Sequence, residues 1–181
     1  GIDLLTFKDS NWSADFPEAV QQAILLYRPG YPVAVDGAIA LDQVAVSHLV
    51  GAVGPLVIPD AGIVVTEDSL LDYMHEAWAP EDGQMDAAWW RERKSFMGEL
   101  AEAVLARVTS GSVDYSRLGD AVLEMLTARH LQVYLREPVG SSVMADLGWD
   151  GALPQTDGDF LMVVESNVGY NKTSASVDRT F

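Results

Sequence analysis

The stretch from Val33 to Pro59, VAVDGAIALDQVAVSHLVGAVGPLVIP, constrains the fold of this chain more than any other. Two apolar runs rich in β-branched residues, Val33 to Leu41 and Leu56 to Ile58, enclose a segment, Asp42 to Val53, with apolar residues at three- and four-residue spacings. A strand, a short helix and a second strand form a β-α-β unit, whose strands are expected to be parallel and covered on both faces. The sequence therefore predicts an α/β fold.

Local signals mark the ends of this helix and predict the elements around it. Asp42 is suited to cap the helix, and Gly54-Pro55 ends it because proline cannot continue the hydrogen-bond ladder. Further helices are expected with Pro17 in the first turn, at about Glu67 to Trp78, from near Met85 to Val108, at Tyr115 to Arg129 and at Ser142 to Leu147. Strands are expected at Ile63 to Val65, His130 to Arg136 and Phe160 to Glu165.

These elements predict a single α/β domain over residues 1–181, with a mixed, mostly parallel sheet of about five or six strands and helices on both faces. Ile2 to Phe7 starts like a strand, and Ser176 to Phe181 begins to look like one where the chain stops. We therefore expect the domain to be truncated at both ends.

The composition excludes several classes of function. The formal net charge of −16 repels phosphate backbones, so nucleic acid is not an expected partner. The chain has no cysteine, which excludes disulfides, thiolate catalysis and cysteine-ligated metals and fits an extracytoplasmic domain. Its histidines, His48, His75 and His130, lack a metal-binding spacing, so neither a metal nor a cofactor is predicted. No apolar run approaches the ~20 residues of a membrane-spanning helix.

Arg93 is the most informative polar residue. It lies four residues after Trp89 and four before Met97, so it projects from the apolar side of the expected helix. A guanidinium group keeps its charge and needs an anionic partner when it is desolvated. One interpretation is an internal salt bridge to a carboxylate. The other is a phosphate clamp that Arg93 forms with Arg91 and Lys94.

Two more sets of residues are candidates to line a site. Trp89 and Trp90 offer aromatic faces for a sugar or lipid, with core filling as the alternative. Asn167, Asn171 and Lys172 follow a predicted strand, where polar side chains are well placed to bind a ligand; capping of the turn is the alternative. The sequence identifies no catalytic residue, since it contains neither a G-x-S-x-G motif nor a P-loop.

Several motifs occur in an order that resembles a known family. They are NWSADFPEA at Asn11 to Ala19, VDGAIALDQVAV at Val35 to Val46, GPLVIP at Gly54 to Pro59, ERKSFMGEL at Glu92 to Leu100, GWDG at Gly148 to Gly151 and GDFLMVVESNVGYNK at Gly158 to Lys172. Together they resemble the bacterial and archaeal family of unknown function called DUF4012. The resemblance implies an extracytoplasmic protein. It also implies that the full-length protein is anchored to the membrane by a segment that is absent from this chain. The implied function is a cell-envelope-associated binding or scaffolding domain.

A second resemblance is to the LytR-CpsA-Psr family, which transfers cell-wall glycopolymers from a polyprenyl diphosphate carrier. It rests on a strand with Val35-Asp36, a helix through Leu49-Val50, the segment Gly54 to Pro59, and a later helix that opens with arginines. It implies a phosphotransferase that uses Arg91, Arg93 and Lys94 on a diphosphate with Mg²⁺, although Trp90 stands where that family has an arginine. The partner expected from these resemblances is a cell-wall glycopolymer or lipid-linked sugar.

Overall fold

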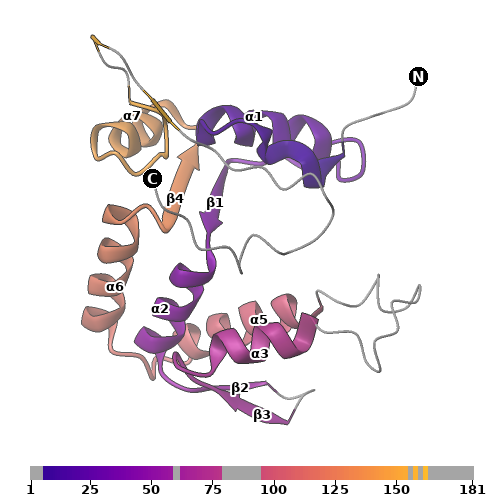
Figure 1. Ribbon diagram of the computed structural model, residues 1–181, viewed down its shortest axis with the longest axis vertical. Coiled ribbons are helices and arrows are strands. Elements are labelled where there is room, and N and C mark those ends of the chain that lie inside the picture. The colour runs from indigo at the N-terminus through magenta and orange to yellow at the C-terminus, as the bar shows by residue number, and fades with distance from the viewer. Residues whose placement is uncertain (1–5, 59–61, 79–94, 155–156, 159–160, 163–181) are drawn as a thin grey trace.

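The computed structural model describes residues 6–58, 62–78, 95–154, 157–158 and 161–162, in which helices and strands occur together (Figure 1). In chain order the elements are η1 (Phe7–Trp12, a 3₁₀ helix), α1 (Phe16–Tyr27), β1 (Gly37–Leu41), α2 (Gln43–Val53), β2 (Leu56–Ile58), β3 (Ile63–Val65), α3 (Leu70–Trp78), α5 (Ser95–Thr109), α6 (Tyr115–Thr127), β4 (Leu131–Leu135) and α7 (Pro138–Asp146). The chain is therefore a mixed α/β protein, as the sequence predicts.

The strands form two separate antiparallel pairs. Strand β1 pairs with β4, with Leu41 opposite Leu131. Strand β2 pairs with β3 as a hairpin, with Leu56 opposite Val65. Because β1 and β2 do not share a sheet, the prediction of a parallel β-α-β unit in a mostly parallel sheet of about five or six strands is wrong for the described residues. An apolar run predicts that a segment is a strand, but it does not determine the strand with which that segment pairs.

The strand predicted at Phe160 to Glu165 lies outside the described residues except for Leu161 and Met162, and neither of these two is in a strand.

The predicted ends of the central helix are confirmed. The Asp42 Oδ1 atom accepts a hydrogen bond from the Ala45 N–H at 2.9 Å, which caps α2. At the other end, Gly54 has a φ of 85° and donates its N–H to the Val50 carbonyl. Helix α1 also begins as expected, with Pro17 in its first turn, and the structure adds Asp15 as its cap.

Two helices begin at other residues than predicted. Thr66 and Ser69 each donate a backbone N–H to the other's side-chain hydroxyl, at 2.9 and 3.3 Å, and this turn delays the start of α3 until Leu70. Helix α7 begins at Pro138, earlier than predicted, because the Glu137 carboxylate caps it by accepting the Val139 and Gly140 N–H groups.

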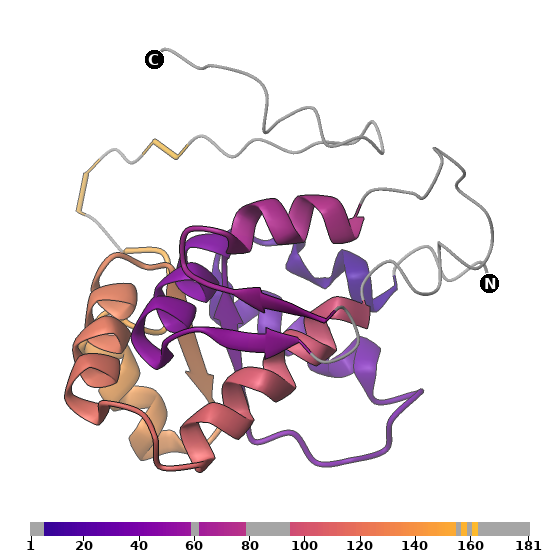
Figure 2. The same cartoon turned by 90° about the horizontal axis from the view of Figure 1, so that it is seen from below.

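Helix α2 contributes to both hydrophobic clusters of the described structure. The hairpin cluster joins α2 to β2, β3, α3 and α5, and its buried members are Val50, Val53, Leu56, Ile58, Val65, Leu70, Met74, Phe96, Leu100 and Val113. The strand cluster joins α2 to α6 and β4 through Ala45, Met125, Leu126 and Leu131. Figure 2 shows the β2–β3 hairpin with α3 on one side and α5 on the other.

The apolar stripe of α5 is narrower than predicted. Phe96 and Leu100 are buried, and Val104 packs against the hairpin cluster. The helical spacing of Met97 and Leu105 predicts that they widen this stripe, but the two side chains are 44% and 63% exposed. The two side chains lie on the solvent side of α5, away from β2 and α2, on which the helix packs.

Two of the sequence motifs meet in space. The Phe16 N–H donates to the Gly151 carbonyl at 3.2 Å, and the Leu153 N–H donates to Asp15 Oδ2 at 3.0 Å. Gly151 has a φ of 67°, and a Cβ atom there would lie 2.5 Å from the Gln132 Oε1 atom and 2.9 Å from the Phe16 Cβ atom. The segment GWDG therefore anchors the start of α1, and the position needs glycine for both backbone conformation and space.

Gly151→Ala is expected to destabilise the fold more than Gly148→Ala. Gly148 has a similar φ of 69°, but nothing lies within 4 Å of a Cβ added there. Gly148→Ala thus reports backbone strain alone, about 1 kcal/mol, whereas Gly151→Ala adds steric overlap and should lower the free energy of unfolding by at least about 2 kcal/mol. Chemical denaturation measures both, and equal losses would show that the contact at Gly151 is not tight.

Candidate functional site

The residues predicted from the sequence to form a site lie outside the described part of the chain. They are the phosphate-clamp residues Arg91, Arg93 and Lys94 and the lining residues Trp89, Trp90, Asn167, Asn171 and Lys172. Their roles stay predictions.

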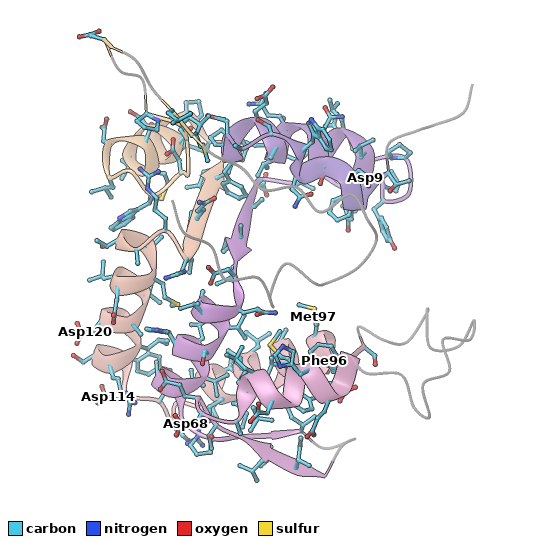
Figure 3. All side chains as sticks on the ribbon, viewed as in Figure 1. Asp9, Asp68, Phe96, Met97, Asp114 and Asp120 are labelled. Carbon is cyan, nitrogen blue, oxygen red and sulfur yellow. The ribbon has the colours of Figure 1, made fainter. Side chains whose placement is uncertain are left out.

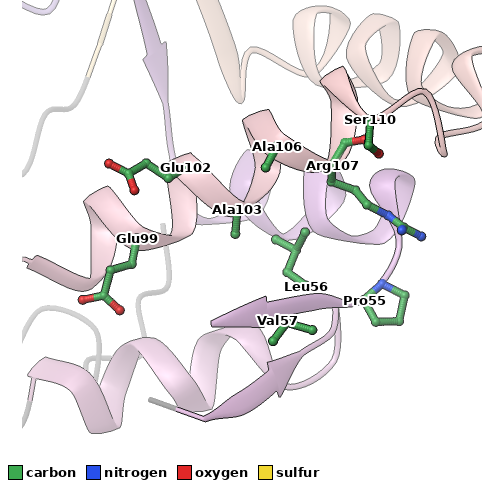
Figure 4. Close-up of a pocket in the computed structure, with 9 residues that line it drawn as sticks. All are labelled: Pro55, Leu56, Val57, Glu99, Glu102, Ala103, Ala106, Arg107 and Ser110. Carbon is green, nitrogen blue, oxygen red and sulfur yellow. The ribbon is translucent and has the colours of Figure 1, made fainter. Parts of the chain in front are cut away.

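An open groove of about 520 Å³ lies between β2 and α5 (Figure 4). The residues that line it are Pro55, Leu56, Val57, Glu99, Glu102, Ala103, Ala106, Arg107 and Ser110. Glu99 and Glu102 lie toward one end, Arg107 and Pro55 lie toward the other, and small apolar side chains lie between them. The groove thus has an apolar middle with opposite charges at its ends.

Helix periodicity and small side chains produce this groove. Glu99, Ala103, Ala106 and Ser110 are three or four residues apart, so they share the face of α5 that looks onto β2. Alanine at two of these positions leaves space that a larger side chain would fill.

Arg107 is a candidate binding residue that the sequence reasoning missed. Its Nε–H donates to the Val53 carbonyl at 3.2 Å, at the C-terminus of α2, where a positive charge is favourable. This bond holds the guanidinium at the mouth of the groove. Its spacing of four residues from Ala103 and eight from Glu99 was the sequence signal that it shares their helix face.

Tyr73 of α3 lies close to the N-terminal part of α5, which carries Phe96 and Glu99. Its ring packs edge-on against Phe96, with ring centroids 5.7 Å apart and an interplanar angle of 88°. Burial raises the pKa of the Tyr73 hydroxyl, and the negative charge of Glu99 raises it further. The phenol is therefore neutral at physiological pH and acts as packing between α3 and α5.

A second hollow, which we call the N-terminal hollow, lies between η1 and α1. It has a volume of about 390 Å³ and is lined by Asp9, Ser10, Trp12, Ser13, Glu18, Ala19 and Gln22. Trp12 is 81% exposed. The Ser13 hydroxyl donates to Glu18 Oε2 at 2.6 Å, which ties η1 to α1.

Asp42 joins the start of α2 to the start of β4. Its Oδ2 atom lies 2.7 Å from His130 Nδ1, with the two side chains 51% and 35% exposed. Burial raises the pKa of Asp42, but hydrogen bonds from the Ala45 N–H and from His130, the charge of His130 and the Val44 N–H outweigh it, so the pKa is below its ordinary value. The shift has a structural cause, because the same carboxylate caps α2.

The described residues contain no group of three or more histidine, aspartate or glutamate side chains placed to hold a metal ion. Within the same residues, none of the helices combines the length and the hydropathy needed to span a bilayer.

A family model with the description "Protein of unknown function (DUF4012)" matches residues 3–78. The DUF4012 resemblance is confirmed over this part of the chain. The DUF4012 match includes the three motifs that precede residue 78, the whole N-terminal hollow and the β2 wall of the groove. Neither a curated protein nor a solved structure matches the chain, and the resemblance to the LytR-CpsA-Psr family has no support from the comparisons.

Asp42→Asn should remove a pH-dependent part of the stability. Because the pKa of Asp42 lies below its ordinary value of 3.8 in the folded protein, the carboxylate stabilises the fold above that pH, and its contribution is lost as the pH falls through the folded pKa. At pH 6 the variant should be less stable by about 0.5 kcal/mol, the range of a half-exposed ion pair. The difference should disappear near pH 2 in urea denaturation.

Asp114→Asn is the matched control, because Asp114 also caps a helix, through the Ser116 and Arg117 N–H groups. An equal pH dependence in both variants would contradict a special role for the contact between Asp42 and His130.

Proposed function

We propose that this chain is a cell-envelope-associated, extracytoplasmic domain that binds or scaffolds an envelope component, with a cell-wall glycopolymer or lipid-linked sugar as its partner. The observation that carries the proposal is the open groove between β2 and α5. The DUF4012 resemblance implies the extracytoplasmic location, and the acidic, cysteine-free composition is compatible with it.

The groove has the size and chemistry of a binding site. Its volume of about 520 Å³ lies within the usual range for ligand sites, which combine apolar walls with a few polar groups that orient the ligand. A lipid-linked sugar has the same two-part character, with an apolar chain and a polar head. Arg107 is the positively charged side chain in the lining and is placed to face an anionic group of such a ligand.

The shifted pKa values of the described residues have structural causes. Burial raises the pKa of Asp42, but helix-capping hydrogen bonds and the contact with His130 outweigh it and lower the pKa. The pKa of Glu137 is lowered by the Gly140 and Val139 N–H groups, which it accepts as a helix cap. The pKa of Tyr73 is raised mainly by burial and then by Glu99. Each shift is accounted for by packing or capping, so none requires a proton-transfer role.

Ala106→Trp should weaken binding to insoluble cell-wall sacculi that carry their glycopolymer. The indole would occupy the groove, so we expect at least a fivefold loss of affinity in a co-sedimentation assay, about 1 kcal/mol. Ala101→Trp is the matched control, because Ala101 is an exposed residue of the same helix and does not line the groove. Equal losses in both variants, or no sedimentation of the wild type, would contradict the proposal.

A different ligand distinguishes the phosphotransferase hypothesis from the binding proposal. Farnesyl diphosphate with Mg²⁺ mimics the lipid carrier, and under the binding proposal it should give no rise in melting temperature that depends on Arg93. A rise that is present in the wild type and lost in Arg93→Ala would favour the phosphate clamp of Arg91, Arg93 and Lys94, and with it the transferase.

A further inference from the structure

We propose that the N-terminal hollow binds a sugar ring that carries an ammonium group, such as a hexosamine unit of a polysaccharide. The inference rests on the proposed function and deepens it, because it names the chemical class of an envelope ligand. It also assigns a second place on the chain, remote from the groove of α5, where such a ligand is held.

Trp12 is the centre of this site. A single exposed apolar side chain is ordinary, but Trp12 borders a hollow of about 390 Å³ whose other lining residues, apart from Ala19, carry polar groups. The flat indole offers its face to the C–H groups of a sugar ring and attracts a nearby cation through its π electrons. A wide aromatic surface beside polar side chains therefore suits a ligand with an apolar face and a polar edge.

The polar walls match the edge of such a ring. Glu18 and Gln22 lie four residues apart on α1 and therefore on one face of that helix. Carboxylate and amide groups are planar and accept or donate two hydrogen bonds, which fits neighbouring hydroxyl groups of a sugar. The Ser13 hydroxyl donates a hydrogen bond to Glu18 Oε2 and thereby holds that carboxylate in one orientation.

Charge selects an ammonium group over an acidic one. The lining contributes the carboxylates of Asp9 and Glu18, and none of its described side chains is cationic. An anionic sugar would be repelled there, whereas a protonated amine is attracted by the Glu18 carboxylate and by the net charge of −16 on the whole chain.

The walls of the hollow are fixed before a ligand arrives. Asp9 Oδ2 accepts hydrogen bonds from the Thr6 N–H at 2.9 Å and the Thr6 hydroxyl at 2.7 Å, which holds the start of η1. Asp15 caps α1 through the Glu18 N–H at 3.0 Å and accepts the Leu153 N–H with its other oxygen. Such preorganisation lowers the entropy lost on binding.

The test compares three tetrasaccharides by isothermal titration calorimetry at pH 6 and low salt. The glucosamine tetramer should bind, whereas the N-acetylglucosamine tetramer, which lacks the charge, and the uncharged maltotetraose should bind at least fivefold more weakly. Trp12→Ala should weaken the glucosamine tetramer about tenfold, and Glu18→Gln about fivefold with a smaller dependence on salt.

Two variants serve as matched controls at the far end of the molecule. Tyr115→Ala removes another exposed aromatic side chain, and Asp120→Asn removes another exposed carboxylate, which lies on α6 far from Asp9 (Figure 3). Both should keep wild-type affinity. Equal binding of the three sugars, unchanged binding in Trp12→Ala, or the same loss in Asp120→Asn as in Glu18→Gln would overturn the inference.

The two proposals fail separately. If the protein sediments with sacculi in a way that depends on Ala106 but does not bind the glucosamine tetramer, this inference is overturned and the proposed function is supported. Binding of the tetramer that depends on Trp12, without sedimentation of the wild type, supports the sugar site and overturns the proposed function.

Discussion

The described structure depends on the burial of helix α2 between two hydrophobic clusters. Ala45 packs toward α6 and β4, whereas Val50 and Val53 pack toward the β2–β3 hairpin. Both ends of the helix are also held by side chains that match its dipole. The Asp42 carboxylate lies at the positive N-terminus, and the Arg107 guanidinium donates to the Val53 carbonyl at the negative C-terminus. Elements far apart in the sequence are therefore joined through one central helix.

The two candidate sites differ in their dependence on this helix. The groove is formed by β2 and α5, which meet through the hairpin cluster, and its guanidinium is held by the last turn of α2. The N-terminal hollow is formed by residues 9–22 and is braced by capping bonds and by the segment that follows Gly151. A change in the packing of α2 would thus alter the groove directly and leave the hollow's own walls intact.

Several carboxylates in this acidic protein have a structural role as helix caps. Asp15, Asp42, Asp114 and Glu137 all accept backbone N–H groups at the starts of helices. Glu99 and Glu102 line the groove, and Asp9 and Glu18 line the N-terminal hollow. Some carboxylates of the described residues thus begin helices, and others contribute negative charge to the two hollows.

The sequence by itself determined the α/β composition, the cap at Asp42, the end of α2 at Gly54 and the proline in the first turn of α1, because each depends on residues within about four positions. Its motifs also identified DUF4012 over residues 3–78. Only the tertiary structure decided that β1 pairs with β4 and that Met97 and Leu105 face solvent. It also placed Arg107 beside the end of α2 and Trp12 beside α1. These outcomes depend on which distant surfaces bury one another, and a local pattern of apolar residues carries no information about its partner.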